Sequence, residues 1–336
     1  MNGLRTISLV TLVAGIVGAT SVPAQASSDL RQRDDTASLQ SETEVTDSFA
    51  TLRRVDDHPL YEMSYVGDYD SLYNVVPVEL PSSFGCSLFA AFGEADHPLF
   101  ARNFDWDPDA ALLVNTDPPD GYASVAIVDM LYLGIEPGQD PTQDPEARDH
   151  LLNAPLAPID GVNEMGLAIG LAADESGSAD ADPTRSTVSG LRIMRLVLDN
   201  AATVEEANGV FEQYNLDFTG GPALHYLVAD AGGASAVVEF VDGEMVVIRA
   251  ATSWQALTNF RQANASANEF QNDARWATAA DALESAGGAV DPTAALGILE
   301  AVHQGHTQWS VVYDLATGDG HVVMGQQWAN VYEFDL

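Results

Sequence analysis

The chain of 336 residues carries 50 acidic and 13 basic side chains, which gives a formal net charge of −37. Such a charge repels phosphate groups, so neither nucleic acid nor an anionic membrane surface is an expected partner. All 13 basic residues are arginines, which excludes a Walker A lysine, a Schiff-base lysine and a Ser–Lys dyad. With 46% hydrophobic residues the chain can bury a large core, and its acidity suits solubility in concentrated salt.

The first 26 residues have the pattern of an export signal. Arg5 precedes an apolar run over residues 7–17, and the small-residue sequence Ala24-Gln25-Ala26 follows it. The run is shorter than the roughly 20 residues that a membrane-spanning helix needs. We therefore predict cleavage after Ala26 and a periplasmic or extracellular protein without a stable membrane span. The alternative is an uncleaved N-terminal anchor.

The segment that follows changes in character along its length. Residues 27–57 are polar and rich in Asp, Glu, Ser and Thr, which predicts a flexible lead without a core of its own. Aromatic and apolar side chains return over residues 61–84. Part of this second stretch is expected to pack on the domain that follows.

From Cys86 onward the pattern is typical of an α+β domain with strands at both ends. Two apolar runs around a turn at residues 93–98 predict a hairpin. Residues 139–149 contain two Asp-Pro steps and predict a loop, and Thr203 with Glu206 predicts a capped helix start. Further helices are predicted over 189–200, 273–284 and 293–302, and further strands over 225–229, 236–240, 245–248, 309–314 and 320–324.

Cys86 is the only cysteine of the chain, so it cannot form an intramolecular disulfide. It is either a buried structural thiol or a reactive one. The predicted hairpin brings Arg102 and Asp105 toward it, and an arginine beside a thiol lowers the thiol pKa. If Cys86 became the first residue of a processed chain, its α-amino group, with an ordinary pKa of about 7.7 to 8.0, would serve as the base. A catalytic cysteine therefore requires neither histidine nor lysine here.

The residues around Cys86 resemble a known superfamily. Gly85-Cys86-Ser87, followed by Leu99-Phe-Ala-Arg102-Asn103-Phe-Asp105, is similar to the opening of the cysteine N-terminal-nucleophile (Ntn) hydrolases that cleave linear amides. These include the choloylglycine hydrolases, the penicillin V acylases, the acid-ceramidase group and the isopenicillin-N acyltransferase group. Similar later motifs are Gly161-Val-Asn163-Glu-Met-Gly166, Leu257-Thr-Asn259 and Arg275. The resemblance covers nearly everything after Gly85.

This resemblance implies an α+β, four-layer αββα sandwich with two antiparallel sheets, activated by self-cleavage between Gly85 and Cys86. Residues 1–26 are then a signal peptide, and residues 27–85 are a propeptide that is removed or kept as a small chain. Residues 86–336 form the catalytic domain. In this scheme the Cys86 thiolate attacks an amide carbonyl and its α-amino group moves the proton, with a thioester intermediate that water resolves.

The resemblance also implies roles for the residues around the nucleophile. Arg102 poises the thiol, and Asp105 holds the α-amine and assists self-cleavage. Asn163, together with Asn259, stabilises the oxyanion. Arg275 pairs with Asp105 or with a substrate carboxylate.

Metal and nucleotide chemistry are disfavoured by the motifs. Asp105-Trp-Asp107-Pro-Asp109 has the spacing of a calcium loop, but Ala110 and Thr116 occupy the positions that require Gly and Glu. The spacing of His303 and His306 would place both on one face of a helix, but no third metal ligand lies within reach in the sequence. No dinucleotide-binding or nucleophile-elbow motif is present. We expect neither a metal nor a cofactor.

The predicted function is that of an exported, self-activated amidase that hydrolyses a linear amide C–N bond, other than a peptide bond, in a small N-acyl substrate. Two alternatives remain open: an acyltransferase of the same fold, and an acidic exported binding protein with an inactive site. The cleaved propeptide is an expected partner, and the sequence is compatible with a homo-oligomer. The acyl and amine groups of the substrate are not decided by any motif.

Overall fold

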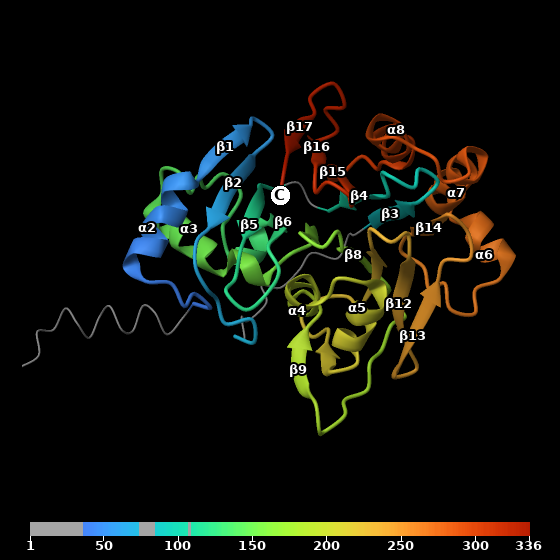
Figure 1. The fold of residues 1–336 in the computed structure, drawn as a ribbon, viewed down its shortest axis with the longest axis horizontal. Helices are drawn as coiled ribbons and strands as arrows, with labels where there is room; N and C mark the ends of the chain where they lie inside the picture. The colour runs from blue at the N-terminus through green and yellow to red at the C-terminus, as the bar shows by residue number, and fades with distance from the viewer. Residues whose placement is uncertain (1–35, 74–84, 107–108) are drawn as a thin grey trace, which may run out of the picture. The chain divides into compact units, whose positions relative to one another are not determined.

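Two large β-sheets pack against each other in the computed structural model of this chain, which describes residues 36–73, 85–106 and 109–336 (Figure 1). Neighbouring strands in these sheets are antiparallel, apart from the parallel pair β2–β5. The six-stranded sheet contains, in spatial order, β14 (Trp254–Leu257), β3 (Gly85–Ala91), β4 (Leu99–Asp105), β15 (Thr307–Asp314), β16 (Gly320–Met324) and β17 (Tyr332–Phe334).

The second sheet has nine strands and reaches from the N-terminal segment to the middle of the chain. Its strands, in spatial order, are β1 (Arg53–Asp56), β2 (Leu60–Tyr65), β5 (Ala111–Thr116), β6 (Ser124–Asp129), β7 (Asp160–Asn163), β8 (Ala168–Ala173), β11 (Leu224–Ala229), β12 (Ser235–Val241) and β13 (Glu244–Arg249). A separate parallel pair is formed by β9 (Ser186–Ser189) and β10 (Tyr214–Asp217).

Helices cover the outer faces of both sheets. Among the described residues, the α-helices are α2 (Glu42–Thr51), α3 (Pro145–His150), α4 (Arg192–Asn200), α5 (Val204–Phe211), α6 (Ala267–Asn272), α7 (Ala274–Ala286) and α8 (Pro292–Val302), with 3₁₀ turns η1 (Met130–Leu133) and η2 (Leu151–Leu156). Helices α7 and α8 pack on the six-stranded sheet, and α4 and α5 pack on the nine-stranded sheet. The predicted four-layer αββα architecture is confirmed.

The pleat of β3 explains why this strand is buried along its whole length and is apolar apart from Ser87. Leu88 and Ala90 belong to the core shared with the nine-stranded sheet, whereas Phe89 and Ala91 belong to the core beneath α7 and α8. Successive side chains of a strand point to opposite faces, so a strand between two packed layers must be apolar on both. Gly170 of β8 allows the close approach of the sheets, because a Cβ there would lie 2.8 Å from Leu88.

Most of the elements predicted after Cys86 are confirmed. The hairpin is β3–β4, and the later predicted strands and helices correspond to β11, β12, β13, α7, α8, β15 and β16. The loop predicted over residues 139–149 is wrong at its end, where α3 begins. Asp144 caps α3 through the N–H groups of Glu146 and Ala147, and Pro145 occupies the first helical position. The Asp-Pro step there starts a helix, because proline lacks an N–H that the first turn would leave unpaired.

The flexible lead predicted for residues 27–57 is also wrong for its described part. Ser41 and Glu44 form a complete capping box at the start of α2, and β1 and β2 then extend the nine-stranded sheet. Within β2, Leu60 and Met63 are fully buried. Within residues 36–57 themselves, Ala37 is buried and Phe49, Leu52 and Val55 pack against the core. Strand β2 belongs to the next stretch, where packing on the domain was expected.

In the described part of the chain, no helix combines the length and the apolar character that a membrane crossing requires. The predicted signal peptide and its cleavage site lie outside the described residues.

Candidate active site

Cys86 lies in β3, in the interior between the two sheets, and only 1% of its surface is exposed. The antiparallel register places Gly85 opposite Asp105, and Cys86 opposite Phe104. Because Arg102 stands two residues earlier on β4, its long side chain reaches the thiol, and Nη2 donates to Cys86 Sγ at 3.1 Å. The hairpin thus brings Cys86 and Arg102 into contact, as the sequence predicted.

The guanidinium of Arg102 is fully buried and is held from the opposite sheet. Its Nη1 donates to the carbonyl oxygen of Ile159 at 2.9 Å and lies 3.4 Å from Asp160 Oδ2. Asp160 in turn accepts hydrogen bonds from Tyr313 Oη at 2.5 Å and Trp309 Nε1 at 3.0 Å. A buried charge needs such partners, because unpaired burial costs several kcal/mol. Asp160 therefore positions Arg102, and the sequence analysis missed it.

The structure corrects one expectation about the thiol. Burial raises the pKa of Cys86 above its ordinary value, and although Arg102 lowers it, burial is the larger effect. The carboxylate of Asp105 also raises the pKa of this thiol. In the continuous chain Cys86 is therefore a protonated thiol at neutral pH, and a base must remove its proton before it can attack.

The backbone nitrogen of Cys86 is held separately from its sulfur. It donates to Asn259 Oδ1 at 2.6 Å, and Arg275 Nη2 donates to the same oxygen at 3.1 Å. Arg275 also donates through Nη1 to the carbonyl oxygen of Cys86. In a chain processed at this residue, the same nitrogen is the α-amino group. The sequence predicted that Asp105 would hold this nitrogen, whereas in the structure Asn259 accepts its hydrogen bond.

Asp105 is fully buried, and residues late in the chain bind its carboxylate. Thr307 Oγ1 donates to Oδ1 at 2.5 Å, Gln304 Nε2 donates to Oδ2 at 2.9 Å, and Arg275 Nη1 lies 3.8 Å from Oδ2. The expected pairing of Arg275 with Asp105 is present in the structure. The contacts from Gln304 and Thr307 were not predicted.

Asn163 does not join this cluster, which corrects its predicted role at the oxyanion. Its Nδ2 donates to the carbonyl oxygens of Leu198 and Ala201 at the end of α4, at 2.9 and 2.7 Å. Its Oδ1 accepts from the N–H groups of Met165 and Leu167. The side chain is buried. Its amide nitrogen fastens the β7–β8 turn to the end of α4, and its amide oxygen closes the turn itself. From these contacts we propose a structural role for Asn163.

A buried pair that the sequence analysis missed positions the Asn259 loop. His225 on β11 faces Glu239 on β12, with 3.2 Å between Nδ1 and Oε1, and His225 Nε2 lies 2.8 Å from the carbonyl oxygen of Thr258. Glu239 also accepts from the N–H groups of Gln262 and Ala263. Polar residues at inward positions of two predicted neighbouring strands were the available signal.

A largely apolar pocket opens beside Cys86. Its wall is contributed by aromatic and aliphatic side chains from several elements and by the loop after β10. The lining residues are Cys86, Trp106, Tyr132, Leu171, Ala173, Ser189, Gly190, Leu191, Asp217, Phe218, Thr219, Gly220, Gly221, Pro222 and Leu224. Among these, Asp217 alone carries a charge.

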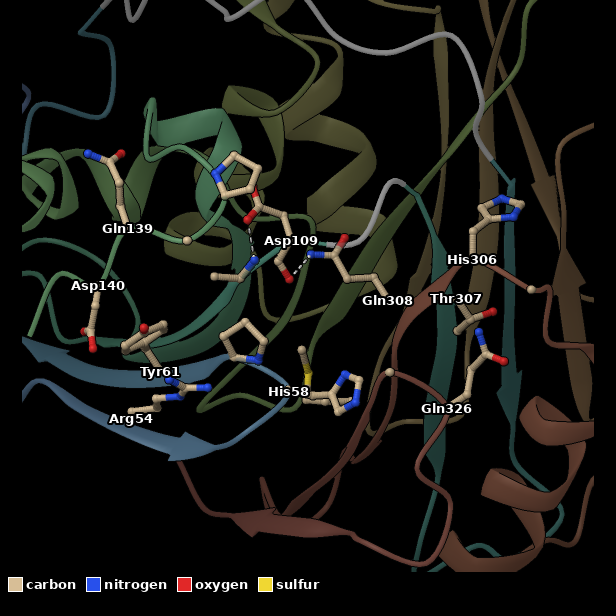
Figure 2. Close-up of a pocket in the computed structure, with 17 residues that line it drawn as sticks. Arg54, His58, Tyr61, Asp109, Gln139, Asp140, His306, Thr307, Gln308 and Gln326 are labelled. Carbon is tan, nitrogen blue, oxygen red and sulfur yellow. Dashed lines mark hydrogen bonds between the residues drawn. The ribbon is translucent and has the colours of Figure 1, made fainter.

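A second pocket lies where the N-terminal segment meets β15 (Figure 2). Arg54 and His58 line it from the N-terminal segment, and His306 and Thr307 line it from the turn before β15 and its first residue. None of the six predicted site residues lines this pocket. It shares only Thr307 with the contacts of Asp105.

The described residues contain no group of three or more His, Cys, Asp or Glu side chains that could hold a metal ion. Asp107 of the calcium-like motif lies outside the described residues.

Comparisons with known proteins agree with this architecture. Residues 152–286 match the family model described as acyl-coenzyme A:6-aminopenicillanic acid acyl-transferase. The structure is similar to penicillin V acylase from Agrobacterium tumefaciens, with a TM-score of 0.55 and 21% identity over 75% of this chain and 86% of the acylase. It is also similar to a mutant of conjugated bile acid hydrolase from Clostridium perfringens, with a TM-score of 0.51 and 16% identity over 75% of this chain and 92% of the hydrolase. Among curated protein sequences, none is similar enough to count as a relative.

The role of Asn163 can be tested by Asn163→Ala. We predict that the free energy of unfolding falls by about 2 to 4 kcal/mol, because four backbone groups lose their partner, three of them in buried hydrogen bonds. Denaturant unfolding of the variant checks this, with Asn268→Ala at an exposed position of α6 as the control. Unchanged stability together with a 100- to 1,000-fold loss of rate would instead indicate an oxyanion donor.

The raised pKa of Cys86 predicts the pH dependence of its alkylation in the uncut chain. Only the thiolate reacts with iodoacetamide, so the alkylation rate rises with pH. In the urea-unfolded chain the thiol has its ordinary pKa of about 8.5. We expect the curve of rate against pH for the folded chain to lie at higher pH than the curve for the unfolded chain. Intact-mass spectrometry separates uncut from cut chains and counts the alkylated thiol. A folded curve displaced to lower pH contradicts the prediction.

Proposed function

We propose that this chain, which has the fold of the Ntn hydrolases, is a self-activated amidase with Cys86 as its N-terminal nucleophile. One observation carries the proposal: the sulfur and the nitrogen of the same residue are held by different partners. Arg102 contacts Sγ at 3.1 Å, and Asn259 accepts from the nitrogen at 2.6 Å. Such an arrangement keeps a nucleophile and its own base in fixed orientation.

Self-cleavage needs only groups of this site and one water molecule. Sγ attacks the carbonyl carbon of Gly85, the S–C bond forms, and the C–N bond to Cys86 breaks. The thiol proton goes to the Cys86 nitrogen, which becomes an amine. Water then hydrolyses the thioester and leaves a carboxylate on Gly85 and a free thiol and α-amine on Cys86.

Turnover of a substrate amide would repeat these steps. The α-amine of Cys86 takes the thiol proton, Sγ attacks the substrate carbonyl, and the amine returns the proton to the leaving nitrogen. Asn259 Nδ2 donates at present to the carbonyl oxygen of Ala173, a residue of the pocket wall, at 3.1 Å. A second hydrogen on that nitrogen makes Asn259 our candidate oxyanion donor.

The pocket beside Cys86 supports an apolar acyl group as the part of the substrate that is bound. Trp106, Tyr132, Leu171 and Phe218 provide apolar surface, and the described residues that line the pocket include no arginine to pair with a carboxylate. We propose neutral N-acyl amides with an aromatic or aliphatic acyl chain as substrates.

We further propose that the chain is exported by residues 1–26 and that residues 27–85 stay bound as a small chain after cleavage. The parallel pairing of β2 with β5 and the burial of Leu60 and Met63 support retention. Removing this strand would expose a sheet edge and part of the core.

The first test is intact mass with N-terminal sequencing of the protein after export. We expect two chains that begin at Ser27 and Cys86 and that co-elute on a native sizing column, because β2 holds them together. A Cys86→Ala chain begins only at Ser27 and stays whole. An uncut wild-type chain would support the inactive binding protein instead.

The cut protein is then assayed with 4-nitroanilides of phenylacetic, hexanoic and glutaric acid. We expect 4-nitroaniline release from the first two, at least about tenfold faster than from the carboxylate-bearing glutaryl compound, because Asp217 repels it and no cation binds it. The family match to an acyltransferase model favours a second function, acyl transfer. Adding glycinamide decides between them: free acid as the product at all glycinamide concentrations indicates a hydrolase, and N-acyl glycinamide indicates a transferase.

A further inference from the structure

The turn between α8 and β15 holds both oxygens of the Asp105 carboxylate. Gln304 donates through Nε2 to Oδ2 at 2.9 Å, and Thr307 donates through Oγ1 to Oδ1 at 2.5 Å. The two residues are themselves linked, because the Gln304 N–H donates to Thr307 Oγ1 at 2.9 Å. One tight turn therefore sets the position of Asp105.

The same glutamine lies against the residue that precedes the cleavage point. A Cβ added to Gly85 would lie 2.0 Å from Gln304 Nε2 and 3.3 Å from the Cβ of Asp105. Atoms at 2.0 Å overlap, so a side chain at position 85 forces the Gln304 amide to move. That amide is the group bonded to Asp105.

We propose that Gln304 is a positioning residue for self-cleavage, which makes the placement of Asp105 depend on a glycine at position 85. With glycine present, the Gln304 amide fits between residue 85 and the carboxylate. With any larger residue, the amide is displaced and Asp105 loses one of its two hydrogen-bonded anchors. This inference rests on the proposed self-cleavage between Gly85 and Cys86.

In self-cleavage Asp105 acts as a proton carrier, and proton transfer depends on the exact position of its carboxylate. Its negative charge raises the pKa of the Cys86 thiol, and the residue lies opposite Gly85 in the register. Before cleavage the α-amine does not exist, so another group must accept the thiol proton. Asp105 accepts that proton as Sγ attacks the Gly85 carbonyl, and it delivers the proton to the Cys86 nitrogen as the C–N bond breaks. The carboxylate ends unchanged.

A double-mutant cycle on the full chain tests the coupling. The self-cleavage rates of wild type, Gly85→Ala, Gln304→Ala and the double variant are followed by pulse–chase in a cell-free synthesis reaction. We expect Gly85→Ala and Gln304→Ala each to slow cleavage by about tenfold or more, since both release the Oδ2 anchor of Asp105. In the Gln304→Ala background, Gly85→Ala should cost less than about threefold further, because the clash is gone.

Controls separate positioning from folding. Each variant is also made with Cys86→Ala, which prevents cleavage, and its thermal unfolding shows whether the precursor folds. Gln143→Ala, which removes an exposed side chain that donates to its neighbour Thr142, is expected to cleave at the wild-type rate.

The inference is overturned if the two losses of cleavage rate multiply in the double variant. It is also overturned if a folded Gln304→Ala chain cleaves at the wild-type rate. A wild-type chain that is never cut at this bond contradicts the proposed function and this inference together. A wild-type chain that is cut, without coupling between the two positions, contradicts this inference alone.

Discussion

The buried guanidinium of Arg102 is the interaction on which the site depends. It is carried by β4 of one sheet, is held by Asp160 and the Ile159 carbonyl from the other, and donates to the thiol of Cys86. A cation at this depth is tolerated only with such partners, so the packing of the two sheets and the environment of the nucleophile are linked. A shift of one sheet against the other would leave the cation unpaired and the thiol without its donor.

The remaining parts of the site come from distant places in the sequence and are fixed by backbone contacts. The loop that carries Asn259 is held by the His225–Glu239 pair, and the first turn of α7 presents Arg275. The turn before β15 supplies the partners of Asp105. His225, Glu239 and Thr307 are buried, whereas Arg275 and Gln304 are half-buried. Each makes its own hydrogen bonds, so the site inherits the rigidity of the two-sheet core.

The predictable part of this structure was the part with a local signal. Alternating or continuous apolar runs between turns identified the β3–β4 hairpin and most later strands, and the hairpin geometry placed Arg102 near Cys86. Asn163 shows what a local sequence motif cannot predict. Its motif gives a residue type, but not the direction of the side chain, which is decided by the end of α4 packed beside it. Gln304 and Asp160 carry no motif, because their roles arise only when separate strands meet.

Two other predictions were wrong because they used the average polarity of a segment and overlooked individual residues within it. The polar composition of residues 27–57 predicted a flexible lead, yet in the described part a capping box starts α2, and β1 pairs with the edge strand β2. Likewise, a charged stretch with Asp-Pro steps concealed the first turn of α3, where the same two residues are a favourable cap.

The parallel pairing of β2 with β5 has a consequence for the life of a molecule cut after Gly85. In the continuous chain, β2 finds its place at a high effective concentration, because it is tethered. Once the bond is gone, a denatured molecule consists of two pieces that must meet in solution, so recovery of the native state becomes second order and slows on dilution. Activation would then convert a protein that refolds on its own into one whose lifetime is set by how slowly it first unfolds.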